Sequence, residues 1–134
     1  MEDPRLATLL QIGELAERVE LSLRTVRYYD EAGLLAPASR TSGGYALYDD
    51  GAVDRLLLIK KMKPLGFTLE EMRSLLALRD ELASRGLPPD RRDELSETLR
   101  AWVLLAEEKL AALRAQMSVA EDFVNSLHHD TAYS

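Results

Sequence analysis

The sequence of 134 residues contains no cysteine. These residues therefore form no disulfide scaffold, thiolate metal site, iron–sulfur cluster or cysteine nucleophile. Aromatic residues make up only 6% of the chain, whereas leucine, alanine, glutamate and arginine are abundant, which favours helices over an all-β sandwich. No apolar run approaches the roughly 20 residues that cross a bilayer, and the first residues do not resemble a signal peptide. A mainly helical cytoplasmic protein without membrane contact is expected.

Positive charge is also scarce, with 17 basic against 23 acidic residues and a net charge of −6. Because phosphate binding depends on lysine and arginine, this balance by itself argues against a nucleic-acid partner. Residues 22–63 are the exception, since they carry seven basic and five acidic side chains. A surface that binds nucleic acid is therefore expected in this segment.

Side chains suited to catalysis are few. The only histidines are His128 and His129, near the end of the sequence. Neighbouring carboxylates such as Glu70 and Glu71 diverge on a helix, so they do not form an acid–base pair. The sequence therefore predicts neither an enzyme nor a protein with catalytic, metal-binding or cofactor-binding residues.

Apolar residues recur at helical spacing in four short segments that precede residue 84. Helices are expected over residues 12–18, between the N-cap Ser22 and Gly33, over residues 52–62, and from the N-cap Thr68 to Ala83. Residues 35–50 are rich in turn formers, which predicts a loop or a small two-stranded hairpin, here called the wing.

The first two helices, with the tight turn between them, form the pattern of a helix-turn-helix. In such a motif the second helix enters the major groove of DNA, which makes Arg24, Thr25, Arg27 and Tyr28 candidate contacts. The alternative is a solvated amphipathic helix whose arginines bind nothing specific. Of the two neighbouring tyrosines, Tyr29 is expected to be buried.

The wing carries Arg40, Tyr45 and Tyr48, which could contact the DNA backbone beside the groove. The alternative for its tyrosines is ordinary packing of the hairpin against the helices. Lys60 is added to the candidate DNA contacts as a further cation that could neutralise a phosphate.

A turn-rich linker at residues 84–90 precedes a segment without glycine or proline, residues 91–127. Its apolar positions are spaced by three and four residues, which predicts a coiled-coil helix about 55 Å long. A helix of that length cannot bury its apolar stripe on its own domain, so it needs a partner, most simply a second copy. The stripe consists of Leu95, Leu99, Trp102, Ala106, Leu110, Leu113, Met117, Ala120, Val124 and Leu127.

Residues 11–78 resemble the winged helix-turn-helix domain of MerR-family transcription regulators. The resemblance is carried by RYYDEAGLL at residues 27–35, GYALY at residues 44–48 and LGFTLEE at residues 65–71. It implies a homodimer joined by an antiparallel coiled coil that binds a pseudopalindromic site on double-stranded promoter DNA. It also implies that the dimer bends and untwists the DNA so that RNA polymerase engages the promoter.

Two residues depart from the pattern of this family. Glu20 stands where the tight turn usually has glycine, so a carboxylate-bearing residue is expected in a left-handed conformation. Ala46 stands where the wing usually has arginine, so one DNA contact is expected to be missing. These departures leave open an alternative function as a protein-interaction adaptor that keeps the fold without specific DNA binding.

Family members that sense metals or oxidants use cysteines, so neither signal is expected to act directly on this chain. Any effector would be an unidentified small ligand or protein partner. The expected organisation is a DNA-binding domain at residues 1–83, a linker at 84–90, a dimerisation helix at 91–127 and a flexible tail at 128–134.

Overall fold

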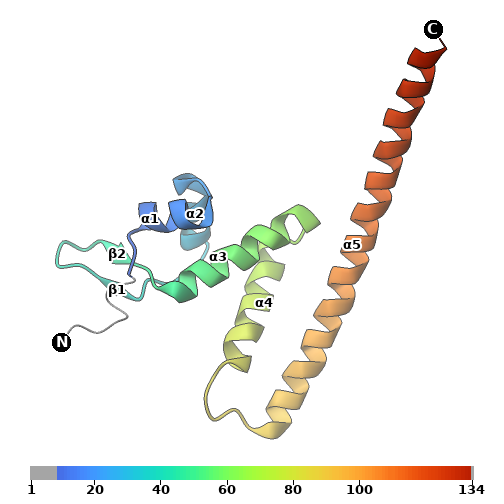
Figure 1. Cartoon of the computed structure of the whole chain (residues 1–134). Helices are drawn as coiled ribbons and strands as arrows, with labels where there is room; N and C mark the ends of the chain where they lie inside the picture. The colour runs from blue at the N-terminus through green and yellow to red at the C-terminus, as the bar shows by residue number, and fades with distance from the viewer. Residues whose placement is uncertain (1–8, 134) are drawn as a thin grey trace. The chain divides into compact units, whose positions relative to one another are not determined.

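The computed structural model describes residues 9–133. Its contacts divide the chain into two units, with the boundary in the sequence between Ala77 and Leu78. The mainly helical fold class predicted from the sequence is confirmed (Figure 1). The elements are α1 (Ile12–Val19), α2 (Leu23–Glu31), β1 (Ser39–Arg40), β2 (Ala46–Leu47), α3 (Asp50–Met62), the short 3-10 helix η2 (Lys63–Leu65), α4 (Leu69–Leu82) and α5 (Pro89–Ala132). None of the helices in this range is long and apolar enough to cross a membrane.

The core of the first unit lies where α1 packs against α2 and α3 (Figure 1). Apolar positions at helical spacing on each of these helices face inward, and Leu15, Val26 and Leu56 are fully buried. Full burial of such an aliphatic side chain contributes about 1.5–3 kcal/mol to stability. The predicted helical periodicity therefore corresponds to a real apolar core, which holds α2 in place.

Side-chain caps begin α3 and α4. The capping box predicted at Thr68 is confirmed: the Glu71 amide donates to Thr68 Oγ1 at 3.1 Å, and the Thr68 amide donates to Glu71 Oε1 at 2.9 Å. α3 begins at Asp50, two residues earlier than predicted. The carboxylate of Asp49 accepts a hydrogen bond from the Ala52 amide at 3.3 Å, so Asp49 is the N-cap.

The predicted wing is a hairpin of two short antiparallel strands, in which Ser39 pairs with Leu47 and Arg40 pairs with Ala46. A further bridge ties the hairpin to the segment before α1, since Leu10 and Tyr48 exchange two backbone hydrogen bonds of 2.8 and 2.7 Å. The wing is therefore anchored to the rest of the unit at its β2 end.

In the second unit, α5 is a single helix of 44 residues. At 1.5 Å per residue it is about 66 Å long. It begins at Pro89, because proline is well tolerated in the first helical turn. It also extends beyond Leu127, so the helix ends at Ala132, five residues later than predicted. No glycine or proline interrupts those residues, and the Tyr133 amide still donates to the Asp130 carbonyl at 3.3 Å.

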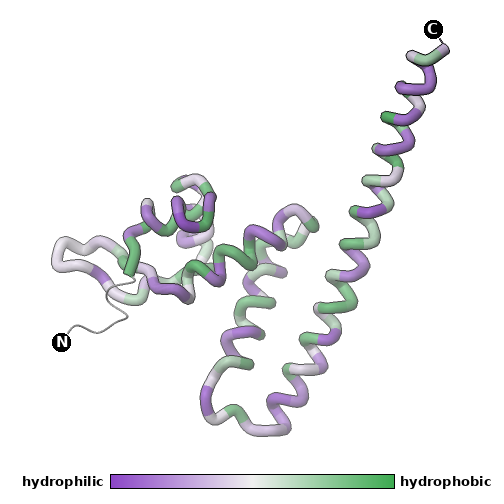
Figure 2. Tube along the Cα trace, viewed as in Figure 1, coloured by the Kyte–Doolittle hydropathy of each residue, from purple (hydrophilic) through white to green (hydrophobic). Residues whose placement is uncertain are grey.

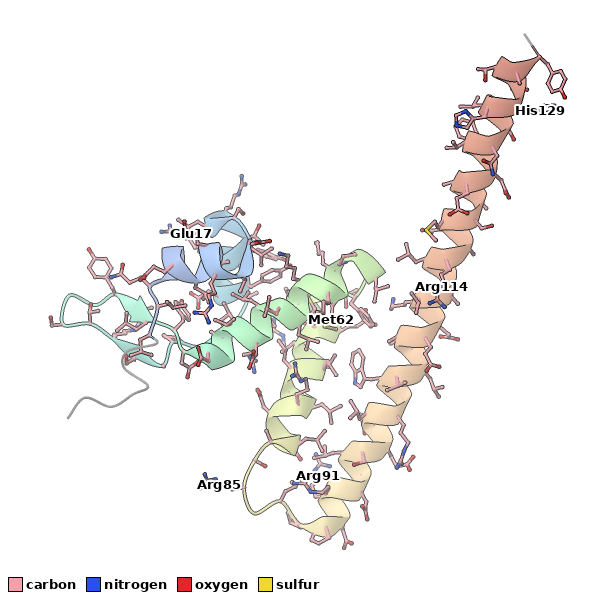
Figure 3. All side chains as sticks on the ribbon, in the orientation of Figure 1. Glu17, Met62, Arg85, Arg91, Arg114 and His129 are labelled. Carbon is pink, nitrogen blue, oxygen red and sulfur yellow. The ribbon has the colours of Figure 1, made fainter. Side chains whose placement is uncertain are left out.

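The last turn of α4 and the first turn of α5 are joined by Arg91 (Figure 3). Its guanidinium donates two hydrogen bonds to the Glu81 carboxylate, at 2.6 and 3.1 Å, and one to Glu94 at 2.9 Å. The hydrogen bond from Arg91 lowers the pKa of Glu81. This bidentate pair fixes the turn that precedes the long helix.

Candidate nucleic-acid interface

The turn between α1 and α2 depends on a left-handed residue. Glu20 has φ 56° and ψ 45°, and within residues 9–133 it is the only residue other than glycine with a positive φ. The Leu21 amide donates to the Ala16 carbonyl at 3.0 Å, which closes the end of α1. The left-handed position predicted at Glu20 is therefore confirmed.

Lys60 of α3 binds the end of α1. Its ammonium donates to the Val19 carbonyl at 2.9 Å and to the Glu20 carbonyl at 3.4 Å. Glu20 Oε2 lies 4.0 Å from the same nitrogen. A cation at this place is favoured, because the C-terminal end of a helix carries partial negative charge. Lys60 thus has an intramolecular role that the sequence alone did not indicate.

The two faces of α2 have different environments. Val26 and Tyr29 face the core, whereas the Tyr28 ring is 54% exposed. The predicted burial of Tyr29, which is 5% exposed, is therefore confirmed. Arg24 and Arg27 are exposed as well. One face of α2 consequently offers two guanidinium groups and a phenol to a ligand.

The N-terminal end of α2 is capped by Ser22. Its hydroxyl oxygen accepts a hydrogen bond from the Thr25 amide at 3.1 Å, and it donates to Thr25 Oγ1 at 2.8 Å. Thr25 is half-buried. The Thr25 hydroxyl therefore helps to organise the first turn of α2, at the edge of the exposed face.

The C-terminal end of α2 is held by backbone and by a side chain of α3. Gly33 adopts φ 82°, as its predicted left-handed position requires, and the Leu34 amide donates to the Tyr29 carbonyl at 3.0 Å. Arg55 Nε donates to the Leu34 carbonyl at 2.8 Å. α3 therefore contacts the chain both before and after α2.

The wing presents one aromatic ring and one guanidinium. The Tyr45 ring is 68% exposed. Arg40 is also exposed, and its guanidinium donates to the Gly44 carbonyl at 3.2 Å across the hairpin. Since an arginine has five donor hydrogens, this bond leaves others for a ligand. The side chain of Ala46 ends at Cβ, so it offers no polar group here.

Tyr48 lies in the core, where its side chain cannot contact DNA, and the prediction of such a contact is wrong. The ring is 1% exposed. Its pKa is raised by burial and by the negative charge of the nearby Asp30 carboxylate, both of which favour the protonated phenol. Tyr48 thus links the wing to α2, as the packing alternative for the wing tyrosines suggested.

Replacement of Tyr48 by phenylalanine tests this link. The folded pKa lies above the ordinary value of 10.0, so its contribution to stability is complete below pH 10 and is lost as the pH rises through the folded pKa. At pH 7 the variant should lose about 1 kcal/mol of unfolding free energy, because the phenol no longer interacts with the Asp30 carboxylate.

When the pH is raised from about 7 to about 11, the unfolding free energy of the variant should fall by less than that of the wild type, because the variant has no Tyr48 phenol to ionise. Urea unfolding at about pH 7 and about pH 11 measures both effects. Tyr45→Phe, which changes an exposed ring, is the matched control and should behave like the wild type. An unchanged pH dependence in Tyr48→Phe would contradict the assigned role.

Two hollows flank the exposed face of α2. One, of about 560 Å³, is lined by Leu23, Arg24, Arg27, Tyr28 and Glu31. The other, of about 310 Å³, lies between α2 and the wing and is lined by Gln11, Ile12, Arg27, Asp30, Glu31, Tyr45, Ala46 and Tyr48. The first hollow has two arginines and one carboxylate, whereas the second has one arginine and two carboxylates, so a phosphate is better placed in the first.

The predicted stripe of α5 remains largely open to solvent in the single chain. Six of its large apolar residues are between 37% and 57% exposed, namely Leu99, Leu110, Leu113, Met117, Val124 and Leu127. Apolar positions recur along the whole helix (Figure 2). A contiguous apolar surface of this kind marks an interaction site.

Leu95 differs from the rest of the stripe. It is only 5% exposed within the single chain, so it already packs in its own protomer before any partner binds. Trp102 and Ala106 are half-buried. The apolar surface left for a partner therefore begins near Leu99. Over the described residues, no three histidine or acidic side chains are grouped so that they could hold a metal ion.

Two family models match the chain, "MerR HTH family regulatory protein" over residues 10–78 and "MerR, DNA binding" over residues 53–128. The mercuric resistance operon regulatory protein of Bacillus cereus is 44% identical over 79 residues, which cover 58% of this chain and 60% of that protein. The HTH-type transcriptional regulator HmrR of Sinorhizobium medicae is 32% identical over 121 residues, which cover 90% of this chain and 73% of that protein.

A similar solved structure is that of the transcription regulator PbrR691 from Ralstonia metallidurans, in complex with lead(II). It is 32% identical, with a TM-score of 0.52, and the match covers 81% of this chain and 82% of that one.

Proposed function

The chain belongs to the MerR family of DNA-binding transcription regulators, and on this premise we propose that it binds promoter DNA as a homodimer. The observation that carries the proposal is the exposed face of α2, where Arg24, Arg27 and Tyr28 line one hollow and Arg27 lines a second together with the hairpin. A helix that presents such side chains next to a wing fits the major groove. A transcription regulator of this kind is not an enzyme.

We assign the contacts by exposure. Arg24 and Arg27 reach base edges or phosphates from α2, together with Tyr28, while Thr25 acts at the edge of this face. Arg40 and Tyr45 contact the backbone from the wing, since both are exposed there. Tyr48 holds the wing in place from the core.

The dimer follows from α5. Its exposed stripe from Leu99 to Leu127 would be covered by a second copy in an antiparallel coiled coil. Two DNA-binding units would then address the two halves of a pseudopalindromic site. In this proposal residues 1–83 bind DNA, residues 84–88 link the parts, and the stripe of α5 joins the protomers.

The mechanism proposed for the dimer is deformation of the promoter. A stiff coiled coil fixes the separation of the two copies of α2, the recognition helices, so DNA must bend and untwist to fit both. RNA polymerase, in the cytoplasm, would then engage the reshaped promoter. The adaptor alternative lacks a supporting observation, because the exposed face of α2 keeps its arginines.

The signal that we propose to control this chain is not one of the metals named for its relatives. The names of the matched proteins refer to mercury and lead, whereas these 134 residues contain no cysteine. Carboxylates and imidazoles bind such soft metals poorly. We therefore propose that control comes from the protein level, an unidentified small ligand or a protein partner, and that metals and oxidants have no direct effect.

Replacement of Arg27 by alanine tests the DNA-binding role. We expect binding to a promoter duplex to weaken about tenfold or more per half-site, because one guanidinium contact is lost. The fold and the dimer should persist, since an exposed guanidinium contributes little to stability. Fluorescence anisotropy gives the affinity, and circular dichroism and sedimentation give the fold and the dimer.

Arg85→Ala is the matched control, because Arg85 is exposed in the turn between α4 and α5 (Figure 3). It should bind DNA like the wild type. Equal losses in both variants, or unfolding of Arg27→Ala, would contradict a specific role for Arg27.

A further inference from the structure

Lys60 is directed toward the end of α1, although part of its side chain is open to solvent. Its ammonium donates to the carbonyls of Val19 and Glu20 at 2.9 and 3.4 Å, and its side chain is 40% exposed. The Glu20 carboxylate approaches to 4.0 Å but is 86% exposed, so solvent screens that ion pair. The two carbonyls are therefore the main partners of Lys60.

These carbonyls belong to the turn that sets the direction of α2. Glu20, in its left-handed conformation, is separated from the N-cap Ser22 by a single residue. A change of φ or ψ at Glu20 would rotate the recognition helix as a whole. The ammonium holds both carbonyls at once, and it thereby restrains the dihedral angles between them.

α3 also fixes the chain beyond the other end of α2. Arg55, five residues before Lys60 on α3, donates to the Leu34 carbonyl at 2.8 Å. The recognition helix is thus flanked by two cationic side chains of one helix, each hydrogen-bonded to backbone. α3 provides the scaffold against which α2 is oriented.

We infer that Lys60 is a positioning residue for DNA recognition, which acts by orienting α2 rather than by neutralising a phosphate. The inference rests on the proposed function. A phosphate contact would require the ammonium to leave the Val19 and Glu20 carbonyls, and these groups would then lose a charge-assisted hydrogen bond. Lys60 should therefore control how well the protein selects its site, without adding to the number of phosphates neutralised.

The test is Lys60→Met, which gives an unbranched side chain one atom shorter and removes its donors. The probe is a fluorescent duplex selected from a random pool by the wild-type protein, with a scrambled duplex of equal composition for comparison. Binding to both is titrated at several salt concentrations. Circular dichroism at the assay temperature gives the folded fraction. Lys60→Gln keeps an uncharged NH2 group that can donate, and it serves if Lys60→Met is incompletely folded.

Lys60→Met should bind the selected duplex about tenfold more weakly and prefer it over the scrambled duplex by a correspondingly smaller factor. Its slope of log affinity against log salt should equal that of the wild type. Lys60→Gln should give an intermediate affinity with the same slope. Lys61→Met is the matched control: Lys61 is an exposed neighbour with no hydrogen bond or ion pair to the described residues, and its loss should leave the preference unchanged.

Two results would overturn the inference while leaving the proposed function intact. One is a salt dependence whose slope becomes shallower by about 0.9 for each protomer, with an unchanged preference for the selected duplex. That result is the signature of a lost phosphate contact. The other is a folded Lys60→Met protein with wild-type affinity and preference, which would make Lys60 a stabilising residue only. A wild-type protein that selects no duplex would overturn the proposed function itself.

Discussion

Replacing Leu113 by glutamate should convert the protein from a dimer into monomers. Leu113 lies near the middle of the stripe and is 42% exposed in the single chain. In an antiparallel pair the substitution places two carboxylates near the middle of the apolar seam. A buried unpaired charge costs several kcal/mol, so dissociation should become at least about a thousandfold easier.

The affinity for the promoter should also decrease when the dimer dissociates. One DNA-binding unit makes few contacts, and a coiled coil raises the concentration of the second unit at its half-site to about the millimolar range. The monomer should therefore bind at least about a hundredfold more weakly. Sedimentation velocity and anisotropy at matched concentrations measure the two effects.

Leu104→Glu is the control for this substitution. Leu104 precedes Leu113 by nine residues, and at about 100° per residue the two side chains lie on opposite faces of α5. Leu104 is 65% exposed and outside the stripe, so its replacement should leave the dimer intact. A Leu113→Glu protein that sediments as a dimer would show that another surface joins the protomers.

Promoter affinity should also fall steeply with salt. Arg24, Arg27 and Arg40 are the exposed cations assigned to DNA, which gives six for a dimer. If each neutralises one phosphate, the slope of log affinity against log salt is about −5, and affinity falls about a thousandfold between 50 and 200 mM salt. This dependence separates the regulator from an adaptor.

Isothermal titration or anisotropy across that salt range gives the slope, and circular dichroism confirms that the protein stays folded. Arg27→Ala should make the slope shallower by about 2 for the dimer, whereas Arg85→Ala should leave it unchanged. An affinity that is independent of salt would favour the adaptor.

Local patterns in the sequence were sufficient for most of the fold. The helical spacing, the capping box at Thr68, the left-handed Gly33 and the buried Tyr29 were all predictable, because each depends on residues within one or two turns of one another. The capping box at Gln11, where the backbone N–H of Gln11 donates to Glu14 Oε1 at 3.1 Å, was missed because glutamine is an uncommon N-cap.

Contacts between distant residues could not be predicted in this way. Lys60 binds a carbonyl 41 residues earlier in the chain, and Arg55 binds one 21 residues earlier. Both residues look like surface cations in a basic segment, and only the packing of α3 against the turns that flank α2 gives them their partners. Tyr48 was misassigned for the same reason, since Asp30 comes from a different element.

The length of α5 has a consequence for the evolution of such proteins. Inserting one residue into a helix adds 1.5 Å but turns everything beyond it by about 100°, which carries half of the stripe away from its seam. Insertions that keep the seam continuous are close to seven residues, or about 10.5 Å, with three or four tolerated as a local change of winding. Relatives of this chain should therefore differ in coiled-coil length by steps, and the spacing of the half-sites that they recognise should change by steps as well.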